Sequence, residues 1–171
     1  MPKQKSVAAA GFTLVELLIV IAIIAIIAAV IFVALDPLTR FKDARDSTRW
    51  QEVAEVINAI KIDQVDNGGF YLTAVSNTNA GEVYMITGNA VASGCDDNNS
   101  NCDVDVTDDD NCVDLSGLVS EGYLGAVPVS PNGTGTWSSS TTGYTLQRDS
   151  SGIVTVRACE SENTDAIWVA R

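Results

Sequence analysis

The side chains of this sequence that could do chemistry are mostly carboxylates. The chain has 22 Asp and Glu residues against 10 Lys and Arg, together with four cysteines and no histidine. Because histidine is the usual base for a Ser or Cys nucleophile, Ser-His-Asp and Cys-His catalytic arrangements are excluded. The formal net charge of −12 disfavours broad binding to the phosphates of nucleic acids. We therefore expect neither an enzyme nor a broad nucleic-acid binding surface.

The carboxylates are densest in residues 95–112, CDDNNSNCDVDVTDDDNC, a composition that predicts a loop. Oxygen donors at alternating positions partly match an EF-hand loop, but Asp108 stands where that loop needs glycine, and its last residue is aspartate instead of glutamate. Two hypotheses remain, a solvated surface loop and a Ca²⁺ site. The candidate Ca²⁺ ligands are Asp103, Asp105, Asp109 and Asp114.

The cysteines lack both the paired CxxC spacing and the histidine partners of a zinc site. We predict two disulfides, which form in an oxidising compartment, and keep free buried thiols as the alternative. Four cysteines allow three pairings. Among these we predict Cys95 with Cys102 and Cys112 with Cys159.

One further carboxylate, Glu16, lies within the otherwise apolar run of residues 11–35. A carboxylate in hydrocarbon costs roughly 2.5 to 3.5 kcal/mol, so a partner is expected. If the chain is cut after Gly11, Phe12 gains an ammonium group and forms an i,i+4 pair with Glu16 on one helical face. The same ammonium group on a neighbouring chain is the alternative partner.

Two helical segments precede the acidic loop. At ~1.5 Å per residue, residues 12–35 form a helix long enough to cross a bilayer. Lys3 and Lys5 precede it, which favours a cytoplasmic N-terminus and an exported C-terminal body. Residues 38–67 are predicted to continue this helix, with an apolar stripe that packs on a sheet. The stripe consists of Val53, Val56, Ile57 and Ile60.

Charged residues cluster in the first turns of this second segment, where they form either a solvated helix face or pairs between subunits. They are Lys42, Asp43, Arg45, Asp46 and Arg49. Beyond the helix, alternating patterns predict strands at 82–87, 144–148, 153–158 and 166–169, with a hairpin loop between the second and third. A short helix is predicted within 113–124, and Trp137 is expected to pack down as a lid.

The string GFTLVELLIV at residues 11–20 resembles the cleavage and methylation motif of type IV pilins and the pseudopilins of type II secretion. In that family a prepilin peptidase cuts after the glycine and methylates the new phenylalanine amine, and the glutamate is needed for filament assembly. The resemblance implies these roles for Gly11, Phe12 and Glu16. Many pilins also carry a proline inside the apolar helix, whereas here the first proline after the leader is Pro37. A bend at Asp36–Pro37 is the alternative to a mid-helix break.

We therefore expect an α+β, pilin-like fold in which a long N-terminal helix packs on a small antiparallel sheet. The expected parts are a leader (1–11), a transmembrane and filament-core helix (12–36), its amphipathic second half (37–67) and an exported domain (68–171).

The function implied by the resemblance is that of a structural subunit precursor of a pilus-like or pseudopilus filament. Its implied partners are other filament subunits, the prepilin peptidase and the pilus or type II secretion assembly machinery. It would reside in the cytoplasmic membrane and then in a cell-surface or periplasmic filament. The alternative is an uncleaved, single-pass, membrane-anchored surface binding module.

Overall fold

The computed structural model describes residues 11–91 and 93–171. The chain divides into two compact units, with the boundary between Leu38 and Thr39. The first unit contains helix α1 (Leu14–Leu35), which ends at Asp36 with a φ of 36°. Among the described residues, Asp36 is the only one other than glycine with a positive φ. Helix α1 stops here because Pro37 has no backbone N–H and disfavours helical geometry in the residue before it.

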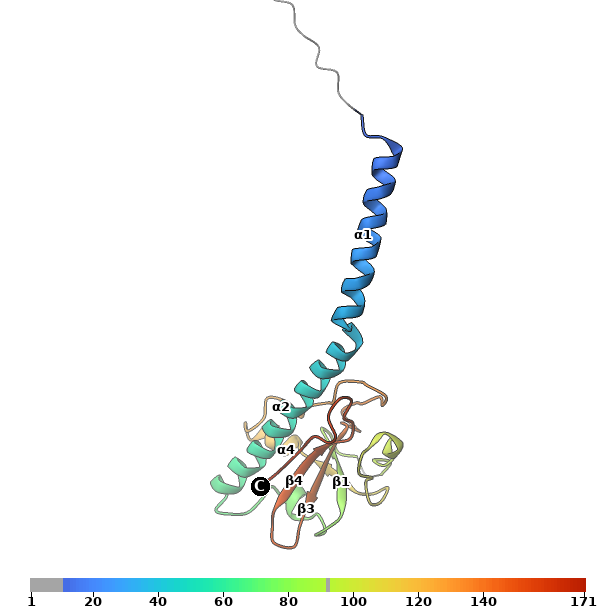
Figure 1. The fold of residues 1–171 in the computed structure, drawn as a ribbon. Helices are drawn as coiled ribbons and strands as arrows, with labels where there is room; N and C mark the ends of the chain where they lie inside the picture. Colours follow the sequence, from blue (N-terminus) through green and yellow to red (C-terminus); the bar gives the residue numbers. More distant parts are fainter. Residues whose placement is uncertain (1–10, 92) are drawn as a thin grey trace, which may run out of the picture. The chain divides into compact units, whose positions relative to one another are not determined.

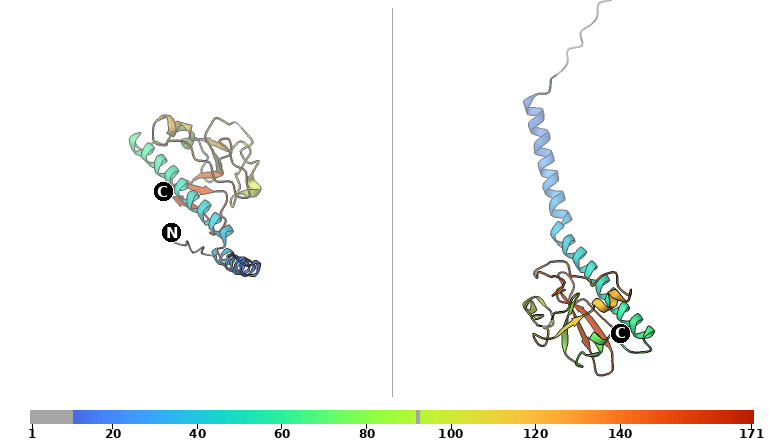
Figure 2. Two further views of the ribbon diagram at one scale, coloured as in Figure 1. Left: turned by 90° about the horizontal axis from the view of Figure 1, so that it is seen from above. Right: turned by 180° about the vertical axis from the view of Figure 1, so that it is seen from behind.

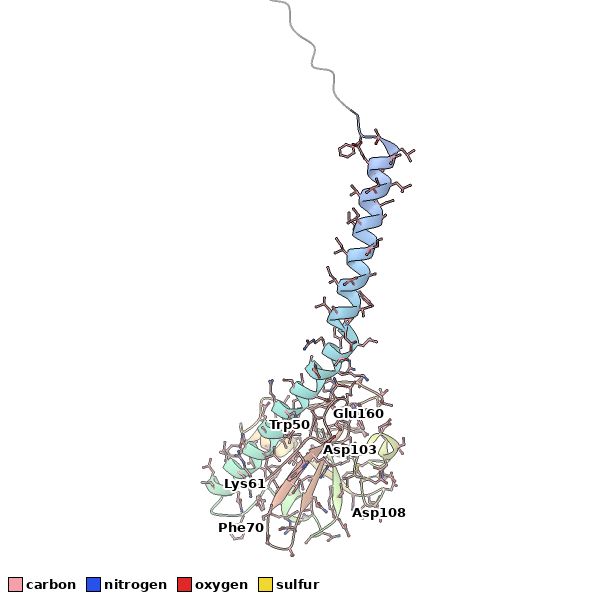
Figure 3. All side chains as sticks on the ribbon, in the orientation of Figure 1. Trp50, Lys61, Phe70, Asp103, Asp108 and Glu160 are labelled. Carbon is pink, nitrogen blue, oxygen red and sulfur yellow. A yellow bond between two sulfur atoms is a disulfide. The ribbon has the colours of Figure 1, made fainter. Side chains whose placement is uncertain are left out.

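Helix α1 is apolar on all sides. None of its side chains is buried in the chain itself, and Figure 3 shows them projecting all around the helix. The helical stretch Leu14–Asp66 contains a window with a mean hydropathy of 3.5, so it is long and apolar enough to cross a membrane by length and composition. A helix that is apolar all round must be covered by something other than water.

The second unit is built on helix α2 (Pro37–Asp66) and a five-stranded sheet with the strand order β2-β1-β3-β4-β5. Along the part of α2 that belongs to this unit, the helix lies across the sheet (Figure 1). The predicted stripe of Val53, Val56, Ile57 and Ile60 is fully buried there. The strands are β1 (Val83–Thr87), β2 (Cys112–Asp114), β3 (Tyr144–Arg148), β4 (Val154–Ala158) and β5 (Trp168–Ala170).

The sheet is mixed, so the prediction of an antiparallel sheet was wrong at one edge. Strands β1 and β2 pair in parallel, whereas the β1–β3, β3–β4 and β4–β5 pairs are antiparallel. A parallel pair needs a long crossover connection, which the segment between β1 and β2 supplies.

Most of the predicted elements are present, with shifted boundaries. The strands predicted at 82–87, 144–148 and 153–158 are confirmed as β1, β3 and β4, and the last strand begins two residues later than predicted. The short helix is α4 (Ser116–Ser120), and the start of the segment predicted to form it belongs to β2 instead. Two further short helices, α3 (Thr73–Ser76) and the 3₁₀ helix η1 (Asn99–Asn101), were not predicted.

Each face of the sheet has its own core. Residues of α2 and the inner face form the larger one, which includes Leu146 and Val156. On the other face, Met85 packs with Cys95, Val106, Trp137 and Cys159. Figure 2 (left) shows the strands between α2 and the yellow-green loop region that supplies part of this second core. The acidic loop therefore covers part of the sheet, and Trp137 packs down with an exposed fraction of 6%.

Candidate processing and assembly site

The N-terminal end of α1 is organised by a hydrogen-bonded capping box. The backbone N–H and the hydroxyl of Thr13 both donate to Glu16 Oε2 at 2.8 Å, and the Glu16 N–H donates to Thr13 Oγ1 at 3.2 Å. Thr13 has an extended backbone, with φ −82° and ψ 151°, as an N-cap residue requires. The Glu16 carboxylate is thus partnered within its own chain, while Phe12 beside it is 84% exposed.

Thr13, which caps α1, is a residue that our sequence reasoning did not single out. Its signal was present, because Thr followed three residues later by Glu, ahead of an apolar run, is the capping-box pattern. In the uncut chain the Phe12 nitrogen is a peptide amide. The pairing of a Phe12 ammonium group with Glu16 therefore stays a prediction for the cut form.

A comparison with protein families matches this same end of the chain. Residues 8–32 match the family described as the prokaryotic N-terminal methylation motif, which is the prepilin-type signature of type IV pilins and pseudopilins. The match indicates a prepilin-type N-terminus similar to that of type IV pilins, a family whose members are structural proteins. The motif and the apolar helix fit anchoring in a membrane before filament assembly. No curated protein and no solved structure matches this chain.

The predicted charged cluster on α2 contains a buried arginine. Arg49 is fully buried, and its Nη1 lies 2.8 Å from Asp46 Oδ1 and 2.9 Å from Glu162 Oε1. Its Nη2 lies 3.1 Å from Glu160 Oε2 and donates to the Pro131 carbonyl at 2.9 Å. The fork of donors on a guanidinium group suits this convergence of acceptors.

Arg45 completes the cluster from one turn earlier. Its Nε donates to Glu162 Oε1 at 2.6 Å, and its Nη2 bonds to Glu162 Oε2. These bonds, with a smaller contribution from Arg49, hold the pKa of Glu162 down at about 2. The hypothesis of a solvated helix face was therefore wrong for Asp46 and Arg49, which are buried and paired within the chain. Pairing of the charged cluster between subunits stays a prediction.

Three of the four candidate Ca²⁺ ligands accept hydrogen bonds from different partners in the structure. Asp109 Oδ1 accepts from the Gly94 N–H at 2.6 Å, Asp114 Oδ1 from the Ser116 N–H at 2.8 Å, and Asp103 Oδ2 from the Ser161 hydroxyl at 3.2 Å. Asp105 is exposed.

Within residues 11–91 and 93–171, no group of three or more acidic, Cys or His side chains is arranged to hold a metal ion. Ca²⁺ binding by Asp103, Asp105, Asp109 and Asp114 stays a prediction, and the described residues do not bring these side chains together as a ligand cluster. Burial, and then the neighbouring Asp109 carboxylate, raises the pKa of Asp96, as expected where carboxylates crowd together.

All four cysteines form disulfides, but the predicted pairing was wrong. Cys95 pairs with Cys112 and Cys102 pairs with Cys159, so the two loops that the bonds close overlap along the chain. The sequence spacing favoured the short loop between Cys95 and Cys102. In the fold, Cys95 and Cys112 meet because the N–H groups of Gly94 and Cys95 donate to the Asp109 carbonyl near the other end of the loop. Cys102 meets Cys159 just after β4, where the Asp103 N–H donates to the Cys159 carbonyl.

Proposed function

We propose that this chain is the precursor of a filament subunit, cut after Gly11 by a prepilin peptidase and assembled through α1. The observation that carries the proposal is the prepilin-type motif at residues 8–32, which begins a helix with no buried side chain. The leader is removed while the apolar helix is kept. The helix therefore anchors the subunit first and packs against other copies later.

The physical reason for assembly is the apolar surface of α1. In the bilayer, lipid covers it, and helix association relies on packing and on polar contacts. When a subunit leaves the bilayer, only neighbouring helices can keep the surface from water, at about 25 cal/mol per Å² of apolar area. Packing against other copies of α1 covers this apolar surface along the whole length of the helix.

Glu16 has two successive partners in this proposal. In the single subunit Thr13 holds the carboxylate, which lowers the cost of placing it in hydrocarbon. After the cut, the ammonium group on Phe12 of the same or a neighbouring chain replaces or supplements that contact. Where the ammonium group belongs to a neighbouring chain, the ion pair forms only in the packed bundle and favours it over the lone subunit.

The first test is the mass of the N-terminal peptide of the surface form. We expect a chain that starts at a methylated Phe12 and is recovered in filaments sheared from cells or in a periplasmic filament. Glu16→Ala should be cut normally but absent from filaments. A lone surface molecule that retains Met1–Gly11 would overturn the proposal and favour the anchored binding module. If Glu16→Ala forms as many filaments as the wild type, the carboxylate has no role in assembly. The proposal that the chain is a filament subunit would still stand.

The capping contact gives a second test. Thr13→Val removes the hydroxyl that bonds with Glu16 in both directions and should destabilise the first turn of α1 by about 1 kcal/mol. Hydrogen exchange of the amides of residues 14–17 in detergent micelles should become faster. Thr13→Ser, which keeps a hydroxyl, is the matched control and should exchange as the wild type does. Equal exchange in all three chains would contradict the capping role.

A further inference from the structure

The segment 159–165, which we call the strap, is bound to the first turns of α2 by hydrogen bonds. The N–H groups of Glu162 and Asn163 donate to Asp46 at 3.1 and 2.8 Å. The Asn163 side chain reaches further toward the start of the helix, with Nδ2 at 2.7 Å from Asp43 Oδ1 and 3.2 Å from the Thr39 carbonyl. Residues 39–46 are therefore held by a segment that lies far away in the sequence.

The strap also supplies the two carboxylates, Glu160 and Glu162, that pair with the buried Arg49. Asp46 has an exposed fraction of 3% and Arg49 of 0%. When one partner of a buried ion pair is removed, the other charge is left buried without compensation. Such a charge is stabilised if the structure around it opens to water. If the strap moved away, the turns of α2 that carry Asp46 and Arg49 would have to open as well.

One covalent bond fixes the strap at its first residue. The disulfide from Cys102 to Cys159 ties it to the acidic loop, and the Asp103 N–H donates to the Cys159 carbonyl at 2.7 Å. Glu160 follows directly and accepts from the Thr134 N–H at 3.1 Å and from the Gly135 N–H. Figure 3 shows Glu160 and Asp103 close together, whereas Asp108 lies further away on the loop. The other disulfide, Cys95–Cys112, packs in the same core as Cys159 but is not bonded to the strap in the described part of the chain.

We propose that the Cys102–Cys159 disulfide is a redox latch that controls the order of the first turns of α2. When the bond is formed, the strap holds residues 39–49 closed. When it is reduced, the strap and these turns loosen together. Closing the latch removes one proton from each thiol and transfers two electrons to a disulfide oxidant such as oxidised glutathione, which becomes two thiols. The latch concerns the unit Thr39–Arg171 and holds whether or not the chain forms filaments.

The test compares two matched double variants of the full chain in detergent micelles by hydrogen exchange and mass spectrometry. Cys102→Ala/Cys159→Ala should exchange about tenfold faster or more in peptides that cover both 39–49 and 159–165. Cys95→Ala/Cys112→Ala loses the other bond, which lies in the same core but does not hold the strap, and should speed exchange in these peptides much less than the first variant does. Unchanged exchange in the first variant, or equal loosening in both, would overturn the latch.

A second measurement avoids any failure of the variants to fold. The folded wild type is placed in a series of glutathione redox buffers, and alkylation of each cysteine is followed together with exchange at 39–49. We expect faster exchange to follow the alkylation of Cys102 and Cys159. Exchange that follows Cys95 and Cys112, or that stays slow after Cys102 and Cys159 are reduced, would refute the proposal.

Discussion

Arg49 draws together three separate segments of the chain. Its partners lie on α2 (Asp46), in the segment before β3 (Ser130 and Pro131) and in the strap. A fully buried guanidinium group is tolerated because its donors meet charged or strongly polar acceptors. The sequence marked Arg49 as one of several charges on a helix, but its burial depends on a contact with Glu160, which is 111 residues away.

Replacing Arg49 with methionine should be among the most destabilising single changes in the second unit. Asp46, Glu160 and Glu162 would remain partly buried without their shared cation, at a cost of about 3 to 5 kcal/mol. Urea unfolding followed by near-ultraviolet circular dichroism measures the loss. Lys42→Ala, an exposed site on the same helix, is the control and should change the free energy of unfolding by no more than about 0.5 kcal/mol. Similar losses in both variants would contradict the role of Arg49.

Glu162 makes the stability of this cluster depend on pH. Its folded pKa of about 2 lies below the ordinary value of 4.5. The unfolded chain therefore takes up the proton first as the pH falls. The stabilisation is fully present above pH 4.5 and is lost as the pH falls toward 2. Glu162→Gln should be less stable at neutral pH and should lose less stability than the wild type over that acid range, as measured by thermal unfolding. Parallel pH profiles for the two chains would show that Glu162 is not the group responsible.

At the scale of elements, periodicity predicted the helices and hairpin strands well. The stripe of Val53, Val56 and Ile57 and the turn between β3 and β4 are local patterns, and both are confirmed. Strand β2 was missed because it has three residues and exists through pairing with β1 across a long loop. The cysteine pairing failed for the same reason, since it follows from that long-range pairing.

The packing of Trp137 gives a prediction for the glycines of the second unit. Gly143 has a φ of +78°, and a Cβ there would lie 2.5 Å from Trp137 Cδ2 and 2.8 Å from Ser130 Cβ. Gly143→Ala should therefore cost more than about 1 kcal/mol for the backbone alone, with a steric cost in addition. Gly152 has a φ of +88°, and a Cβ there would meet no atom within 4 Å, so this site isolates the backbone effect.

Thermal unfolding followed by tryptophan fluorescence should show a larger loss for Gly143→Ala than for Gly152→Ala. Because the two sites share a positive φ, the difference between them measures the packing of Trp137 and Ser130. Equal losses would mean that Trp137 can shift freely.

At the scale of the whole molecule, the two units have different physical requirements. The unit that contains α1 has no buried side chain in that helix, whereas the second unit has two cores, two disulfides and the Arg49 cluster. Helix α1 in the first unit needs a cover that the described part of the chain does not supply. The second contains the contacts that a folded domain needs.

A fragment Thr39–Arg171 should therefore fold on its own with both disulfides formed. A second fragment, Gln51–Arg171, keeps the apolar stripe of α2 but lacks Arg45, Asp46 and Arg49. Glu160 and Glu162 lose their partners in it, so we expect a melting temperature at least about 4 °C lower, as one lost kcal/mol would give. Circular dichroism on heating measures both fragments. Equal melting temperatures would show that the first turns of α2 contribute nothing to the fold.

The contact between Asp46 and the Glu162 N–H joins positions 116 residues apart. During synthesis, all of α1 and α2 is made long before residue 162. Loop closure over such a separation is slow compared with local helix formation. The first turns of α2 therefore gain these contacts only after almost the entire polypeptide has been made.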